Sequence, residues 1–169
     1  MSGLRYFSYK DHGARLLEQM NYNQAVRVGD RIETAGQVIP RMHNKNPARR
    51  NLEKPGFELT DLAGGWCPKT GEIPSDLLEE IDQVFTNIDL ALRDAGGQGW
   101  SQVYRIRLYA LDEAMTPEAL GRMIENVKKW APNHSPILTG VGVSKLGQPG
   151  MRVEVEVAAY DPEGAKSLQ

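Results

Sequence analysis

The sequence predicts an α+β fold in which two helices lie on one face of a mixed β-sheet. Two amphipathic helical patterns, within residues 75–97 and 116–132, are flanked by segments that alternate between apolar and polar residues. The predicted order of elements is β-β-α-β-α-β-β. Because both helices would cover the same face, the other face of the sheet is left for solvent or for another copy of the chain.

The composition indicates a single globular domain. The chain has 169 residues, of which 40% are hydrophobic and 25% are charged, and its net charge is −2. This charge gives no general attraction to nucleic acid or to anionic membranes. No run of the sequence has the length and apolar character of a membrane span, and residues 1–16 do not resemble a signal peptide. The only cysteine, Cys67, excludes an intrachain disulfide framework, so we expect a cytoplasmic protein without a membrane partner.

The N-terminal half combines a predicted hairpin with a long insertion. Residues 23–37 predict two short strands joined by a turn at Gly29 and Asp30. Residues 38–64 are polar and basic, lack periodicity and contain three prolines. We interpret them as an insertion loop within one domain that spans residues 1–169. Loops of this length inside compact domains are usually functional or disordered.

Both helices have clear boundary signals. The first is expected to begin after Asp76, which forms a capping-box spacing with Glu79, and to end before Gly96. The second has Thr116 as its N-cap and Pro117 as its first residue. The residues predicted to face the sheet are Leu77, Ile81, Val84, Phe85, Ile88 and Leu92 in the first helix, and Leu120, Met123, Ile124, Val127 and Trp130 in the second.

The open face of the sheet is predicted to mix charged and apolar side chains. Residues 103–111 and 151–160 alternate strictly, which is typical of half-buried strands. The side chains assigned to the open face are Val103, Arg105, Arg107, Tyr109, Arg152, Glu154 and Glu156. Such a face is either solvated or buried between copies of the chain, and we favour the second interpretation.

Four stretches of the sequence together resemble the Rid/YjgF family of small trimeric proteins, which are named for hydrolysing reactive enamines and imines. The stretches are YNQAVRVGDRIETAGQ, PKTGEIPSDLLEEIDQVFTNIDLALRDAG, VYRIRLYALD and MRVEVEVAAY, and they span most of residues 22–160. The resemblance implies a chorismate-mutase-like fold, a homotrimer built around the uncovered sheet faces, and three ligand clefts between subunits.

The resemblance also implies a set of cleft residues. Tyr22 matches the cleft tyrosine of the family. Ala35, Gly36 and Gln37 match a Ser-Gly-Gln turn that contributes backbone groups, with alanine in place of serine. Glu154 matches a glutamate that holds or activates water, which makes it the candidate catalytic residue.

The sequence departs from the family at the substrate-carboxylate site. Active members carry an arginine in a PARS-like segment, whereas this chain reads PILT, with Leu138 at the arginine position and Thr139 at the serine position. A guanidinium forms two parallel charge-assisted hydrogen bonds with a carboxylate, and leucine forms none. Losing such a contact commonly costs about 2–5 kcal/mol. The chain therefore resembles an arginine-less branch, with an apolar cleft formed by Leu138, Ile137 and Trp66.

Three functions remain open at this stage. The first is hydrolysis of a small imine or enamine that lacks a carboxylate, with Glu154 holding water and backbone groups near Gly36 and Thr139 orienting the ligand. The second is a non-catalytic trimer that binds a small apolar molecule. The third, endoribonuclease activity through the basic segment 41–54, is weakly supported because a ribonuclease needs a general acid/base pair and only His43 lies there. We expect no nucleic-acid partner.

Structural interpretations compete with these assignments. Glu154 and Glu156 would be polar residues of a strand face without a catalytic role if they paired with neighbouring arginines. In the same kind of interpretation, Tyr22 would pack at a subunit edge. Leu138 would be a core leucine. Cys67 is expected to be inert. The three histidines are scattered without ligand spacing, so the sequence predicts no metal site and no cofactor.

Overall fold

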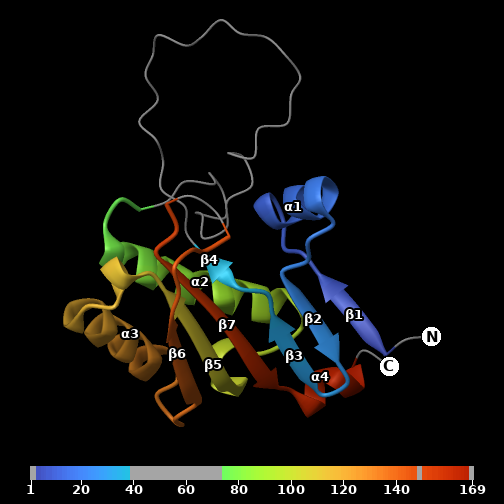
Figure 1. Cartoon of the computed structure of the whole chain (residues 1–169). Coiled ribbons are helices and arrows are strands. Elements are labelled where there is room, and N and C mark those ends of the chain that lie inside the picture. Colours follow the sequence, from blue (N-terminus) through green and yellow to red (C-terminus); the bar gives the residue numbers. More distant parts are fainter. Residues whose placement is uncertain (1–2, 39–73, 148–149, 168–169) are drawn as a thin grey trace, which may run out of the picture.

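The computed structural model describes residues 3–38, 74–147 and 150–167 (Figure 1). Nearly all of the predicted insertion 38–64, together with Trp66, Cys67 and the basic segment 41–54, lies outside these residues. The strands are β1 (Leu4–Phe7), β2 (Ala25–Val28), β3 (Arg31–Thr34), β4 (Gln37–Val38), β5 (Val103–Ala110), β6 (Ile137–Gly142) and β7 (Val153–Tyr160). The helices are α1 (His12–Met20), α2 (Leu77–Asp94), α3 (Pro117–Trp130) and α4 (Pro162–Ser167), with short 3₁₀ turns at Gly99–Gln102 and Asp112–Ala114.

The strands form one mixed sheet, and α2 and α3 lie on one side of it, as predicted (Figure 1). Its order is β1-β2-β3-β7-β5-β6, and the short β4 pairs with β7 beyond the end of β3. Neighbouring strands are antiparallel except β5 and β6, which are parallel. The α+β fold with two helices over one sheet face is therefore confirmed.

The core lies between the sheet and α2. The helix begins after Asp76, whose side chain accepts hydrogen bonds from the backbone amides of Leu78 and Glu79. Phe85 of α2 stacks on Trp100, with ring centroids 4.6 Å apart, and the Trp100 indole donates to the Phe85 carbonyl. The sequence analysis assigned Trp100 no role, although it is one of the largest fully buried side chains among the described residues.

The prediction for the inner face of α3 was partly wrong. Thr116 caps the helix and Met123 is buried, as expected, but Leu120 is exposed and Ile124 is 54% exposed. Asn126 occupies an inward position instead, where its amide donates to Asp82 of α2. The buried residues of α3 are Ala119, Met123 and Asn126, so Leu120 and Ile124 lie on the outer side of the helix.

Two residues assigned to the open sheet face lie elsewhere. Pairing between β5 and β7 shifts register between Val103 and Arg105, so Val103 faces the core and is fully buried. Arg152 precedes β7 and pairs with Glu80 of α2, a carboxylate that is also fully buried. A buried carboxylate needs a charged or hydrogen-bonding partner. The alternation of apolar and polar residues in the sequence does not show that Arg152 is the partner of Glu80.

The segment before the first predicted strand contains β1 and α1, which the sequence analysis missed. β1 extends the sheet antiparallel to β2, with Phe7 opposite Ala25. α1 ends at Asn21, whose left-handed backbone (φ 55°) directs the chain back toward the sheet. The residue that follows, Tyr22, is thereby positioned near the end of β3.

A buried ion pair ties β2 to the C-terminal end of the chain. The Arg27 guanidinium lies 2.6 Å from Asp161, with side-chain exposures of 4% and 1%. Arg27 also donates to the Ala95 carbonyl at the end of α2, and Asp161 accepts hydrogen bonds from Gln102 and Gly164. Burial alone would raise the pKa of Asp161, but these donors outweigh it and lower the pKa below its usual value.

We predict that Asp161→Asn lowers the free energy of unfolding by about 3–5 kcal/mol at pH 7, because it leaves the Arg27 charge buried without a partner. The pKa of Asp161 is lower in the folded state than in the unfolded state, so its contribution is present at neutral pH and is lost as pH falls through the folded-state pKa. Urea unfolding at several pH values measures this difference.

Glu163→Gln is the matched control, because Glu163 pairs with Lys166 on the exposed side of α4. It should change stability by no more than about 1 kcal/mol. Equal effects of the two substitutions, or an Asp161→Asn penalty that grows in acid, would contradict the assignment.

Candidate functional site

The structure brings three of the predicted site residues together where β3 gives way to β4. Tyr22 follows α1, Gly36 lies between the two strands, and Glu154 is on the neighbouring strand β7. The Tyr22 hydroxyl donates to the Gly36 carbonyl over 3.3 Å. A Cβ atom built on Gly36 would lie 1.8 Å from Oε1 of Glu154, so the absence of a side chain at Gly36 allows this close approach.

The remaining two residues of the turn hold its shape. The Gln37 side chain is buried and donates to Oε1 of Gln24 (3.1 Å) and to the Ala35 carbonyl (3.2 Å). The Ala35 amide donates to the Gln24 carbonyl over 2.9 Å. Gln24 was not singled out from the sequence, and its only signal was its place two residues after Tyr22. Side-chain contacts of Gln37 therefore support the turn, and the backbone around Gly36 remains for a ligand.

Glu154 combines partial burial with a raised pKa. Its carboxylate is partly buried and has no hydrogen bond or ion pair among the described residues. Burial, and secondarily the nearby charge of Glu156, raise the pKa of Glu154 above its usual value. The pKa of Tyr22 is also raised, first by burial and then by the charge of Glu154, so the phenol remains a hydrogen-bond donor at physiological pH.

Glu156, two residues further along β7, is in a different state. Its carboxylate lies 2.6 Å from the Arg107 guanidinium and accepts a longer hydrogen bond from Tyr109. Arg107 is directly opposite Glu156 in the pairing of β5 with β7. The interpretation of Glu156 as part of a charged strand face fits these contacts. It does not fit Glu154, which pairs with no arginine in the described part of the chain.

Leu138 and Thr139 lie on the edge strand β6, away from this cluster. Leu138 is beside the core residue Ile106 on the helix side of the sheet and is 49% exposed, whereas Thr139 is beside Arg107 on the open side. Strand spacings place the Cα atoms of Leu138 and Glu154 about 14 Å apart. A single chain therefore does not bring Leu138 to Tyr22 and Glu154.

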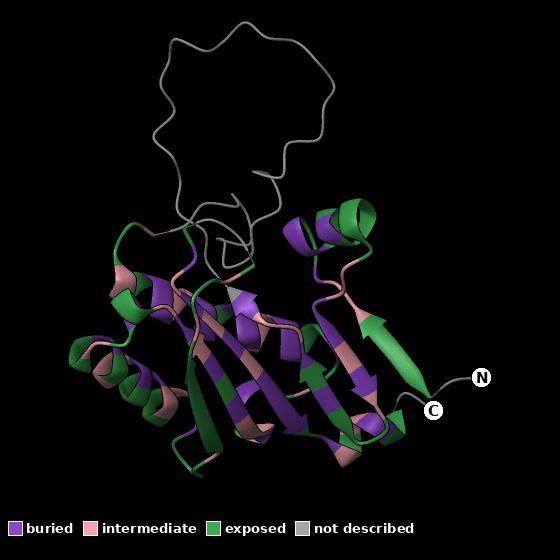
Figure 2. Ribbon diagram, in the orientation of Figure 1, coloured by how far each residue is buried: buried purple, intermediate pink, exposed green. Residues whose placement is uncertain are grey.

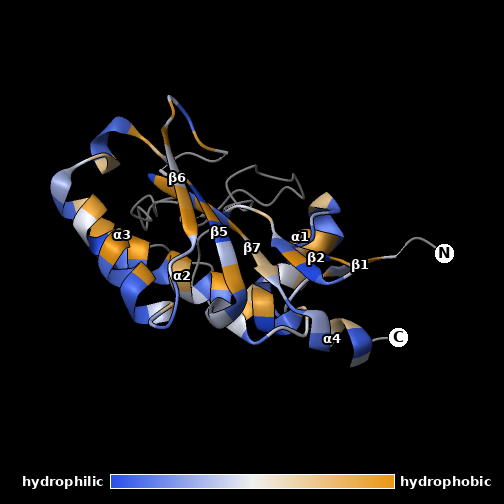
Figure 3. Cartoon of the chain, turned by 90° about the horizontal axis from the view of Figure 1, so that it is seen from below, coloured by the Kyte–Doolittle hydropathy of each residue, from blue (hydrophilic) through white to orange (hydrophobic). Residues whose placement is uncertain are grey.

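The edges of the sheet are its most exposed parts. Figure 2 shows β6 exposed along its length, in contrast to the buried positions of β7. Its exposed residues include Ile137, Leu138 and Val141, and Figure 3 shows the apolar character of this strand. Exposed apolar side chains that gather on one element are typical of a surface that contacts another protein.

The fold is a small α+β domain, and comparison with known proteins places it more closely. A family model described as Endoribonuclease L-PSP matches residues 59–161, more than half of the chain. This chain belongs to that family, which is also known as the YjgF or Rid family. No curated protein sequence matches it.

Solved structures of the family share the fold. Rv2704 of Mycobacterium tuberculosis, a member of the YjgF/YER057c/UK114 family, is 19% identical over 93% of this chain and 98% of its own, with a TM-score of 0.61. RidA from an Antarctic Psychrobacter species is 22% identical over 84% and 89% of the two chains, with a TM-score of 0.60. TdcF from E. coli, solved with bound serine, is 20% identical over 82% and 87%, with a TM-score of 0.59.

None of the helices in the described part of the chain has the length and apolar character needed to cross a membrane.

We predict that Glu156→Gln lowers the pKa of Glu154. The substitution removes a neighbouring negative charge and also releases Arg107, and both changes favour the ionised form of Glu154. A carbon-13 NMR titration of the side-chain carboxyl groups measures this pKa directly. In the wild type, Glu154 should titrate above about 4.3, the value of an unperturbed glutamate.

Glu163→Gln, far from the cluster on α4, provides the control and should leave the titration of Glu154 unchanged. If Glu154 titrated as an ordinary exposed glutamate in the wild type, or if Glu156→Gln raised its pKa, the electrostatic description of the site would be wrong.

Proposed function

We propose that this protein hydrolyses a small imine or enamine that lacks a carboxylate, in clefts formed between three copies of the chain. The observation that carries the proposal is the partly buried carboxylate of Glu154, which lies against Gly36 near Tyr22 and has no hydrogen bond or ion pair with any residue that the structure describes. Family membership supports a role of the deaminase or small-molecule-binding type.

The geometry suits the chemistry of imine hydrolysis. Water adds to the carbon of the C=N bond while the nitrogen takes up a proton, and the C–N bond then breaks to release ammonia and a carbonyl compound. A carboxyl group with a raised pKa is able to donate a proton to nitrogen and then to accept one from water. In our proposal Glu154 performs both transfers, and backbone groups near Gly36 orient the imine.

The proposed cleft requires a second copy of the chain. Leu138 lies on the helix side of an edge strand, whereas Tyr22 and Glu154 border the open side of the sheet. The resemblance assigns all of these positions to one cleft, and a neighbouring copy is able to supply Leu138 and Thr139. The exposed apolar residues of β6 favour such a contact. We therefore propose the homotrimer that is typical of the family.

In this proposal, leucine at position 138 limits which substrates bind well. An apolar side chain cannot form the bidentate contact that a guanidinium makes with a carboxylate, so 2-imino acids should bind weakly. Neutral imines with an apolar substituent fit better. Trp66 is proposed to add to the apolar lining.

We predict that the purified protein accelerates hydrolysis of neutral imines generated in situ by an amine oxidase, and that Glu154→Gln reduces kcat by about 100-fold or more. Ammonia release measures the rate. Glu163→Gln is the control for purification and folding, and it should retain full activity. No acceleration on any neutral or carboxylated imine, with Glu154→Gln equal to wild type, would reject the hydrolase proposal.

Leu138→Arg tests the specificity argument. It restores the arginine of the PARS-like segment, and we expect at least a tenfold gain in kcat/KM on 2-iminobutyrate-like substrates, equivalent to about 1.4 kcal/mol. Wild type and Leu138→Arg should have the same oligomeric state. An inactive Leu138→Arg variant would favour the alternative below.

The alternative function is non-catalytic binding of a small apolar molecule in the same clefts. The half-exposed Leu138 and the absence of a charged group at that position favour it. It predicts that ligands raise the unfolding temperature without being turned over. Endoribonuclease activity has less support. His12 lies on α1, whereas Nε2 of His134 donates to the Val103 carbonyl of β5, so the two histidines in the described part of the chain form no pair.

A further inference from the structure

Glu80 is a fully buried carboxylate in the first turn of α2, and the proposed reaction does not use it. Its Oε1 atom accepts hydrogen bonds from the backbone amides of Arg152 (3.0 Å) and Val153 (3.3 Å). Its Oε2 atom accepts from Nε of Arg152 at 2.5 Å. One side chain on a helix therefore satisfies two backbone donors and a guanidinium at the start of β7.

The helix that carries Glu80 is a fixed support. Ile81 and Val84, which follow Glu80 in α2, are buried in the core beneath the sheet. Close packing of this kind leaves a helix little freedom to move. Arg152 makes a second contact with the same end of the helix, since its Nη2 atom donates to the Ser75 carbonyl over 3.3 Å. The start of β7 is therefore tied to the first turn of α2.

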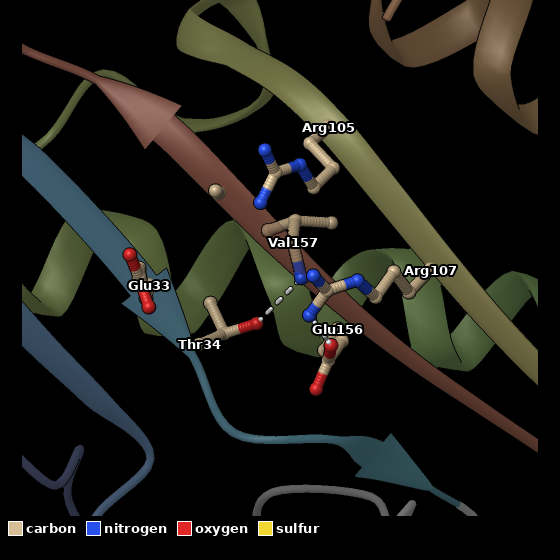
Figure 4. Close-up of a pocket in the computed structure, with 7 residues that line it drawn as sticks. Glu33, Thr34, Arg105, Arg107, Glu156 and Val157 are labelled. Carbon is tan, nitrogen blue, oxygen red and sulfur yellow. Dashed lines mark hydrogen bonds and ion pairs between the residues drawn. The ribbon is translucent and has the colours of Figure 1, made fainter. Parts of the chain in front are cut away.

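Further along, β7 is held by its neighbouring strands instead. The Thr34 hydroxyl of β3 accepts a hydrogen bond from the Val157 amide over 3.1 Å, and Arg107 of β5 pairs with Glu156 (Figure 4). Glu154 lies between these contacts and the two amides that are bound from α2. Its position along the strand is therefore set from both sides, and only the side toward the strand start depends on a helix.

The Glu154 carboxylate has little room for displacement. A Cβ atom built on Gly36 would lie 1.8 Å from Oε1 of Glu154, so the carboxylate is in close contact with the turn. Val153, the preceding residue, faces the core, whereas Glu154 faces the open side of the sheet. A movement of Val153 would carry the Glu154 carboxylate away from Gly36 and Tyr22. Misplacement of a reacting group by about 1 Å is able to lower a rate by about 100-fold.

We propose that Glu80 is a positioning residue for Glu154. Its carboxylate fixes the start of β7 against α2 and thereby holds the Glu154 carboxylate at Gly36. The length of the Glu80 side chain matters more than its charge in this role, because a backbone amide donates to a neutral carbonyl oxygen as well as to a carboxylate. The effect on catalysis rests on the proposed hydrolase function, whereas the effect on the position of Glu154 does not.

Two conservative variants separate length from charge. Glu80→Asp keeps the charge but shortens the side chain by one methylene group, whereas Glu80→Gln keeps the length and an oxygen that accepts from both amides. On neutral imines generated in situ, we expect Glu80→Asp to lower kcat at least about tenfold with KM changed no more than about twofold. Glu80→Gln should keep kcat within about threefold of wild type.

A carbon-13 NMR titration of Glu154 in each variant measures its surroundings without relying on activity. Glu80→Asp should lower the pKa of Glu154 toward about 4.3, because the carboxylate leaves its partly buried position. Glu80→Gln should leave this pKa close to that of wild type. Glu79→Asp is the matched control, since Glu79 is an exposed residue of the same helical turn, and it should change neither kcat nor the pKa of Glu154. Urea unfolding checks that every variant is folded.

Three results separate this proposal from its alternatives. Equal effects of Glu80→Asp and Glu80→Gln, or a larger effect of Glu80→Gln, would overturn the positioning role. It would also be overturned if Glu80→Asp lowered only the free energy of unfolding and left kcat and the pKa of Glu154 unchanged. A wild type that is inactive on every imine would reject the hydrolase function, but a pKa of Glu154 lowered by Glu80→Asp alone would still support the positioning role.

Discussion

The two-residue alternation of β7 separates the residues that form the core from the residues that border the candidate site. Val153, Val155 and Val157 point into the core beneath α2, whereas Glu154 and Glu156 lie on the open side of the sheet. A shift of one residue in the pairing of β7 would place carboxylates in the core and valines on the open face. Because β7 pairs with β3, β4 and β5, its register also sets the position of every other strand near the site.

Three carboxylates differ in how far their surroundings compensate for burial. Asp161 is buried, but Arg27, Gln102 and Gly164 satisfy it, so its pKa is lowered and it stabilises the fold at neutral pH. Glu80 is buried against Arg152, and burial still raises its pKa. Glu154 has a raised pKa and no described partner to offset its burial. A carboxylate held in this way is costly to the fold, and such a cost is common where chemistry requires it.

Sequence reasoning succeeded where the determining interactions are local. The caps at Asp76 and Thr116 and the turn after Gly29 depend on neighbours within a few residues, and the structure has all three. Val103 and Arg152 were misplaced because a register shift and a buried partner on a distant helix determine their positions. Leu120 and Ile124 were misplaced because the helix pattern shows which residues are apolar but not whether they face the core of the same chain.

The candidate site was predictable only in part, because some of its contacts join residues that are distant in the sequence. Tyr22, Gly36 and Glu154 were proposed together from the resemblance to the family, and the structure places them in contact or close to it. Gln24 was missed because its contacts with Ala35 and Gln37 depend on how the chain returns after α1. The α1 segment has no counterpart among the elements that the sequence analysis recognised.

In the proposed trimer, Tyr22, Gly36 and Glu154 of one copy meet the edge strand β6 of another copy. A nuclear Overhauser measurement on a mixed sample tests it most directly, with one population of chains labelled at the leucine methyl groups and the other at the tyrosine rings. The account predicts an intermolecular signal between the methyl groups of Leu138 and the ring of Tyr22. A monomeric protein, or a trimer in which the Leu138 methyl groups contact only their own chain, would contradict it.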